Sequence, residues 1–86
     1  MNIVLYSRPG CHPCFEAKRL LHERSARFGY TWTDVNVDDD PKLQDQFGEC
    51  VPVLIVDGKL RFRGKIEPAL LDRLLIASNR LKGVNS

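Results

Sequence analysis

Residues 3–21 read IVLYSRPGCHPCFEAKRLL, and the fold can be inferred outward from this stretch. The unbroken apolar run that opens it predicts a strand over residues 2–7, buried on both faces as at the centre of a sheet. A proline–glycine pair ends the strand. A helix is expected over about residues 11–27, because Pro13 is tolerated within a first helical turn. The C-x-x-C motif therefore lies where a central strand leads into a helix.

The rest of the chain predicts three further strands and two further helices. β-Branched and aromatic residues mark the strands, an Asp-Gly turn joins the last two strands, and acidic residues or proline open the helices. The expected strands cover residues 30–37, 53–56 and 59–63, and the expected helices cover residues 38–47 and 68–82. The order βαβαββα predicts one α/β domain over residues 1–86, a four-stranded mixed sheet with helices packed on it.

Apolar spacing predicts which side chains face the core. In the strand over residues 59–63, alternation places Leu60 and Phe62 inward, while the basic residues outside keep a sheet edge solvated. The last helix has an apolar stripe of leucines at helical spacing and ends at Gly83. The leucines of this stripe are Leu70, Leu71, Leu74, Leu75 and Leu81.

The composition excludes several classes of protein. With 86 residues, 43% of them hydrophobic and 28% charged, the chain has the size and composition of one soluble domain. A net charge of +2, without basic clusters among aromatic residues, argues against nucleic-acid binding. The apolar runs are too short for a membrane span, and no secretory signal is expected. We expect a monomer that binds neither nucleic acid nor membranes.

The cysteine pair has three interpretations. A structural zinc site normally takes four protein ligands, and Cys50, His12 and His22 do not form a second pair. A structural disulfide across so short a loop removes little chain entropy, and three cysteines in total do not suit a disulfide framework. Redox exchange in a reducing cytoplasm is therefore favoured, and no metal is expected.

Each residue of the motif has a role in redox exchange. Cys11, at the helix N-terminus, has its pKa lowered by free N–H groups and the positive end of the helix dipole, and it attacks as the thiolate. Cys14, one turn further on, is more shielded and resolves a mixed disulfide. Pro13 restricts the turn. His12 either adds positive charge that tunes the thiolate or is a solvated loop histidine.

These residues resemble the glutaredoxin-like members of the thioredoxin superfamily, over about residues 2–75. The resemblance rests on YSRPGCHPCFEAKRLL at residues 6–21, on CVPV at residues 50–53, and on VDG followed by a strand, Gly64 and a terminal helix. It implies a thioredoxin-like fold for the βαβαββα order. The C-H-P-C motif and the FRGKIEP segment are also similar to the small redoxins that thioredoxin reductase reduces.

The resemblance also implies a substrate-binding surface. In this superfamily the proline before the third strand is cis and faces the thiols, which assigns that place to Pro52 and backbone pairing with a substrate chain to Val51. Arg8 matches a basic residue that binds glutathione, and Gly64 matches one glycine of a double-glycine segment. The missing second glycine, and Cys50 in place of a threonine, predict weak or no glutathione binding. No tightly bound cofactor is expected.

The sequence thus predicts a thiol–disulfide oxidoreductase, an enzyme of electron transport and cell redox homeostasis that reduces protein or small-molecule disulfides through a mixed disulfide. Glutathione or thioredoxin reductase would return electrons to it. The alternative is a thiol-based metal or cluster carrier on the same fold, which bound metal in the purified protein would distinguish. Cys50 is expected to be a partly buried residue without a redox role; a third redox-active thiol is the other interpretation.

Overall fold

Four strands form one mixed sheet in the order β2–β1–β3–β4. The strands are β1 (Ile3–Ser7), β2 (Trp32–Asn36), β3 (Val53–Val56) and β4 (Lys59–Arg63). β1 pairs in parallel with β2 and antiparallel with β3, and β4 forms a hairpin with β3. The computed structural model describes the backbone of residues 2–85 and the side chains of residues 2–78. The predicted mixed sheet, with the first strand inside it, is confirmed.

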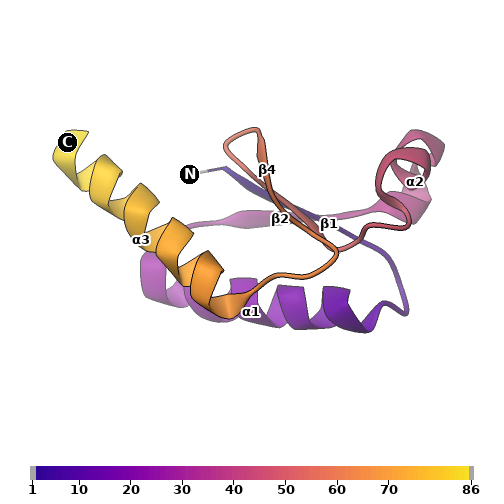
Figure 1. The fold of residues 1–86 in the computed structure, drawn as a ribbon, viewed down its shortest axis with the longest axis horizontal. Helices are drawn as coiled ribbons and strands as arrows, with labels where there is room; N and C mark the ends of the chain where they lie inside the picture. The colour runs from indigo at the N-terminus through magenta and orange to yellow at the C-terminus, as the bar shows by residue number, and fades with distance from the viewer. Residues whose placement is uncertain (1, 86) are drawn as a thin grey trace.

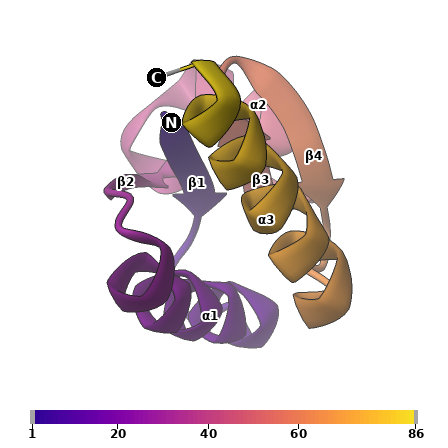
Figure 2. The same ribbon diagram turned by 90° about the vertical axis from the view of Figure 1, so that its left-hand side faces the viewer.

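Helices cover both faces of this sheet. Helices α1 (His12–Phe28) and α3 (Pro68–Asn85) pack on one face, and α2 (Pro41–Phe47) packs on the other, after the short 3-10 helix η1 (Val37–Asp39). Figure 1 shows α1 below the strands and α2 above their far end, and the turned view of Figure 2 shows α1 and α3 lying at an angle to each other. The junction of β1 with α1 lies at one end of the sheet (Figure 1).

Two apolar clusters hold these layers together, one on each face of the sheet. Alternate residues of β1 and β3 divide between them, so that Leu5 and Leu54 enter the larger cluster while Tyr6 and Val53 contact the smaller one. The larger cluster consists of Ile3, Leu5, Ala17, Leu20, Leu21, Tyr30, Leu54, Val56, Ile66, Leu71 and Leu75. The smaller cluster consists of Val37, Phe47 and Val53 beneath α2. Apolar side chains therefore pack against both faces of the sheet, as expected when β1 is a central strand buried on both sides.

The two ends of α1 carry residues suited to them. Pro13 lies in the first turn, where its missing N–H is not needed. Gly29 takes a left-handed conformation (φ 74°), and its N–H donates to Ser25 O at 2.9 Å, which closes the helix. In contrast, α3 continues past Gly83, the residue predicted to end it, because a glycine alone does not force a helix to stop.

Element boundaries before β3 differ from the prediction in two places. β2 begins at Trp32, later than expected, because Tyr30 leaves the sheet and packs in the larger cluster. The helix predicted over residues 38–47 is divided, because Asp40 is extended (φ −140°, ψ 117°) and its Oδ1 accepts a hydrogen bond from Lys42 N–H at 2.9 Å. Asp40 therefore caps α2 instead of continuing a single helix.

The prediction that Leu60 faces the core is wrong. Leu60 is 48% exposed, whereas Phe62 packs against the larger cluster. The pairing of β3 with β4 explains this, since Leu54 lies opposite Phe62 while the next residue, Ile55, lies opposite Leu60. Arg61 is the extra residue of a β-bulge, and it turns Leu60 and Phe62 to opposite faces of the sheet.

The apolar stripe of α3 is narrower than predicted. Leu71 and Leu75 are fully buried and Leu74 is partly buried, but Leu70 is 51% exposed, contrary to expectation. Only one side of α3 contacts α1 and the sheet, and successive helical residues point about 100° apart, which carries Leu70 off that side. Leu81 lies outside the residues whose side chains the structure describes.

Tyr30 makes the stability of the protein sensitive to alkaline pH. The ring is 9% exposed, and its hydroxyl donates to Leu21 O at 2.8 Å. Burial raises the pKa of Tyr30 to about 12, so the folded chain favours the neutral phenol. The resulting stabilisation is complete below the ordinary tyrosine pKa of about 10 and is lost as pH rises from there toward 12.

Tyr30→Phe should therefore change the shape of the pH–stability curve. At pH 8 the variant should be less stable by about 1 kcal/mol, because one hydrogen bond is lost. Above pH 10 the wild type should lose about 1.4 kcal/mol per pH unit from this group, and the variant should not, so the two curves should converge near pH 11. Urea unfolding between pH 8 and 11.5 would measure this, and parallel curves would contradict it.

Candidate active site

The C-x-x-C motif lies at the N-terminus of α1. Cys11 is the N-cap residue, and its Sγ accepts a hydrogen bond from Cys14 N–H at 3.3 Å. A disulfide joins the two cysteines, whose Cα atoms are 5.2 Å apart, an ordinary separation for such a bond. Cys11 is partly exposed, but Cys14 is only 1% exposed. Cys11 is therefore the more accessible of the two sulfurs.

The surroundings of Cys11 favour a thiolate in the reduced protein. α1 is 17 residues long and has no acidic residue in its first turn, so nothing there offsets the positive end of its dipole. The Cys14 N–H, which donates to Cys11 Sγ, stabilises a negative sulfur more than a neutral one. The start of α1 is thus an environment that favours negative charge beside Cys11.

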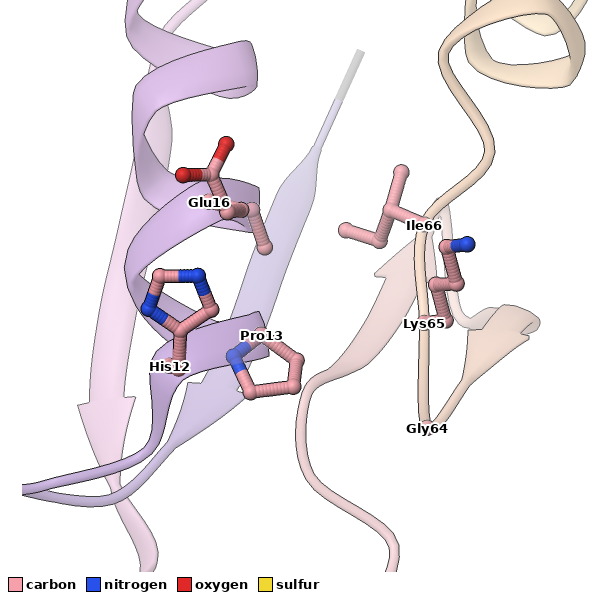
Figure 3. A pocket seen from close by; sticks show the side chains of 7 residues that line it. His12, Pro13, Glu16, Gly64, Lys65 and Ile66 are labelled. Atoms are coloured by element: carbon pink, nitrogen blue, oxygen red, sulfur yellow. The ribbon is translucent and has the colours of Figure 1, made fainter.

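A hollow of about 340 Å³ lies beside the motif, between the start of α1 and the segment that joins β4 to α3 (Figure 3). Pro13 and Ile66 point toward each other from its two sides. Ala17 and Ile66 are buried and give it an apolar floor, while His12 is exposed at its edge. Its full lining is His12, Pro13, Glu16, Ala17, Gly64, Lys65 and Ile66.

Charged groups at the rim of this hollow are paired with one another. The Arg19 guanidinium donates to Glu16 Oε2 at 2.8 Å and lowers the pKa of that carboxyl, so Glu16 remains ionised. On the other side, Lys65 Nζ lies 3.7 Å from Glu67 Oε1. The rim therefore combines both signs of charge around an apolar floor.

The peptide bond between Val51 and Pro52 is cis, as the resemblance implied. Pro52 is buried, and its carbonyl accepts a hydrogen bond from Gly64 N–H at 2.9 Å. Gly64 has φ 85°, a conformation that favours glycine over residues with a side chain. The structure thus joins two of the predicted substrate-binding residues, Pro52 and Gly64, with Val51 partly exposed beside them.

Arg8, the predicted glutathione contact, is bound to the protein itself. Its Nη1 donates to Gly48 O at 2.9 Å, and its Nη2 lies 3.0 Å from Asp38 Oδ1. The guanidinium thus connects the end of β1 with η1 and with the segment that leads to the cis proline. A role for Arg8 in binding substrate stays a prediction.

Asp38 is the member of this site that the sequence does not reveal. Its place in an acidic run before Pro41 indicates the start of a helix, and no spacing rule connects it with Arg8. Ile66 and Lys65 are likewise found only from the fold, although they lie in the FRGKIEP segment that contributes to the resemblance. Ion pairs between distant segments leave no local signal in a sequence.

Cys50 is a free cysteine outside the disulfide. It is partly exposed, packs against the smaller cluster, and its N–H donates to Phe47 O at 2.8 Å. This placement agrees with the partly buried residue that was expected. Whether Cys50 takes part in redox chemistry stays a prediction.

Two observations concern only the residues that the structure describes. Among them, no group of three or more His, Cys, Asp and Glu side chains lies close enough to hold a metal ion. Within residues 2–85, none of the helices has the length and apolar character needed to cross a membrane.

The chain is similar to known proteins in both sequence and structure. Residues 2–76 match the family model described as Glutaredoxin-like domain (DUF836). A glutaredoxin-like protein of Dictyostelium discoideum is 29% identical over 73 residues, which make up 78% of this chain and 68% of that protein. The chain spans about two thirds of the length of the curated relatives it matches.

Solved structures give the same result. A structural-genomics target protein from X. campestris has a TM-score of 0.72 and 29% identity, with 87% of this chain and 96% of that chain covered. NrdH-redoxin from Escherichia coli, a glutaredoxin-like protein with a thioredoxin-like activity profile, has a TM-score of 0.65 and 26% identity, with 86% and 95% covered. The predicted thioredoxin-like fold is confirmed. Given the family match along most of its length and the cysteine pair at the start of α1, this chain belongs to the glutaredoxin-like family.

Proposed function

We propose that this protein is a dithiol–disulfide oxidoreductase that reduces disulfides of proteins or small molecules. The observation that supports this most is the asymmetry of the cysteine pair. Cys11 is partly exposed at the cap of α1, and Cys14 is buried within bonding distance of it. Such a pair has one thiol to attack and a second to resolve, and the glutaredoxin-like family supports a redox role.

The proposed exchange has two steps. In the first, the Cys11 thiolate attacks one sulfur of the substrate disulfide, whose S–S bond breaks, and the departing thiolate takes a proton from solvent. In the second, Cys14 gives up its proton and attacks Cys11 Sγ, which releases the second substrate thiol and forms the Cys11–Cys14 disulfide. Two electrons pass from the protein dithiol to the substrate.

The residues around Cys11 are proposed to bind the substrate. The bond between Gly64 N–H and Pro52 O fixes the backbone on which a substrate chain would lie, and Val51 is placed just before β3 to pair with it. His12 is proposed to tune the thiolate, and Pro13 to restrict the first turn of α1. The apolar floor of the neighbouring hollow suits side chains of a protein substrate.

The reductant is proposed to be glutathione or thioredoxin reductase. NrdH-redoxin has a thioredoxin-like activity profile, and its likeness to this chain supports testing the reductase first. A single domain acting as a monomer in the cytoplasm suits this reaction, because a reducing compartment keeps returning the disulfide to the dithiol. Reduction of the oxidised protein by glutathione alone or by thioredoxin reductase with NADPH would distinguish them.

The thiolate at Cys11 is the feature of this proposal that can be measured most directly. In a Cys50→Ala background, iodoacetamide alkylation of the reduced protein should have a midpoint well below about 8.5, the ordinary cysteine pKa. Mass spectrometry should locate the modification on Cys11. The same protein unfolded in urea is the control, since α1 is then absent and the midpoint should return to the ordinary value. Equal midpoints in the folded and unfolded protein would contradict the proposal.

A further inference from the structure

Asp38 neutralises the cation that lies next to the thiol pair in the chain. Arg8 is three residues before Cys11, and its Nη2 lies 3.0 Å from Asp38 Oδ1. The same guanidinium donates through Nη1 to Gly48 O at 2.9 Å, in the segment that leads to Pro52. Arg8 thus lies between the two segments that flank the site, with both of its terminal nitrogens engaged by the protein.

Two hydrogen bonds fix the backbone of Asp38. Asp38 N–H donates to Asn36 Oδ1 at 2.9 Å, and Gln44 Nε2 donates to Asp38 O at 3.2 Å. Its Oδ1 atom is shielded from solvent and has no hydrogen-bond partner of good geometry, so its interaction with Arg8 Nη2 at 3.0 Å is an ion pair. Because this carboxylate belongs to the same chain, it pairs with Arg8 without the loss of translational and rotational entropy that a dissolved anion would undergo on binding there.

Two other ion pairs lie near the motif. Glu16 forms an ion pair with Arg19 at 2.8 Å, and Lys65 lies near Glu67 at the exposed rim. Because Arg8 is paired with Asp38, a disulfide that carries carboxylates near its sulfurs does not meet this guanidinium as a free partner. A disulfide in a neutral stretch of a protein chain meets no such disadvantage.

We infer that Asp38 is a specificity-determining residue, which selects against anionic disulfides by occupying Arg8. This inference rests on the proposed function, because it concerns the first step of the exchange, in which Cys11 attacks the substrate disulfide and one substrate thiol leaves. The preferred substrates are disulfides without nearby carboxylates, as in neutral segments of partner proteins. Removing the Asp38 charge should free the guanidinium for an anion.

The test compares two disulfides on Asp38→Asn. The fully reduced protein is mixed with oxidised glutathione, which carries carboxylates, or with hydroxyethyl disulfide, which is neutral, and loss of protein thiols is followed. The readout is the ratio of the glutathione rate constant to the hydroxyethyl rate constant, which cancels any general change in reactivity. Asp38→Asn should raise this ratio about two- to fivefold, the effect expected of one exposed charge pair.

Matched variants decide between this inference and a general change of charge. Asp39→Asn removes the same charge from the exposed neighbouring residue and should leave the ratio near the wild-type value. Arg8→Gln should lower the ratio below the wild-type value, because it leaves the Asp38 carboxylate unpaired. The double variant, Asp38→Asn with Arg8→Gln, should not show the rise in the ratio that is expected of Asp38→Asn alone. At about 1 M salt the gain should also disappear, since exposed charges are then screened.

Several outcomes would overturn the inference. An unchanged ratio in Asp38→Asn would do so, as would an equal rise in Asp39→Asn or a gain that survives in the double variant. If Asp38→Asn does not fold, Arg8→Gln still tests the inference through the opposite change. Wild-type protein that oxidises with neither disulfide would instead refute the proposed function, and the inference with it.

Discussion

Cys11→Ser is expected to abolish disulfide exchange, whereas Cys14→Ser is expected to stop it at the mixed disulfide. A serine hydroxyl is not ionised near neutral pH and does not attack a disulfide, so rates should fall by several orders of magnitude, as when other enzymes lose their nucleophile. Cys14 acts only in the second step, and its burial at 1% exposure keeps it from substituting for Cys11. The first variant should therefore form no adduct, and the second should accumulate one.

Mass spectrometry of each variant with hydroxyethyl disulfide measures this directly. Cys14→Ser should gain one mercaptoethanol group on Cys11, and Cys11→Ser should gain none. Cys50→Ala is the matched control, since it removes one thiol outside the pair, and its turnover should stay near the wild-type value. An adduct on Cys14 in the Cys11→Ser variant would show that the assignment of Cys11 as the attacking thiol is wrong. Slow turnover of the Cys50→Ala variant would show that Cys50 takes part in the reaction.

Leu71→Ala is expected to destabilise the fold by about 2–5 kcal/mol. Leu71 is fully buried in the larger cluster, where α3 meets α1 and the sheet. Truncation removes apolar contacts and leaves a cavity, because close-packed neighbours relax only partly. A domain of this size has little stability to spare, so the variant should unfold at a clearly lower urea concentration.

Leu70→Ala is the control on the same helix. The chemical change is identical, but Leu70 is 51% exposed, so the loss should be at most about 0.5 kcal/mol. Urea unfolding of the two variants, followed by circular dichroism, gives both values under one condition. Similar losses in the two variants would mean that the orientation of α3 differs from the one described.

Features that depend on neighbouring residues could be predicted from the sequence. The strand before the motif and the proline in the first turn of α1 are local signals, and both lie where expected. The cis bond at Pro52 came from the resemblance, since no local rule distinguishes it from an ordinary proline before a strand. Its contact with Gly64 required the hairpin to form.

Features that depend on distant partners could not be predicted. The bulge at Arg61 reflects how β4 pairs with β3, and alternation within β4 alone gives the wrong face for Leu60. Tyr30 has the residue type of a strand, yet its side chain packs in the larger cluster and it lies outside β2. The pairing of Arg8 with Asp38 joins segments that only the folded sheet brings together. Residue type and spacing within one segment do not predict contacts with distant segments.

The hydrogen bond from Cys14 N–H to Cys11 Sγ links the redox state of the chain to its resistance to unfolding. A thiolate accepts this bond more strongly than a disulfide sulfur does, and the unfolded chain has it in neither state. Folding and reduction form a closed thermodynamic cycle of four states, folded and unfolded, dithiol and disulfide. An interaction that stabilises the folded dithiol more than the folded disulfide must therefore make the folded protein easier to reduce than the unfolded chain. The difference in reduction free energy between the folded and the unfolded chain therefore equals the difference in unfolding free energy between the reduced and the oxidised protein, so a redox titration and calorimetry of both forms measure the same quantity.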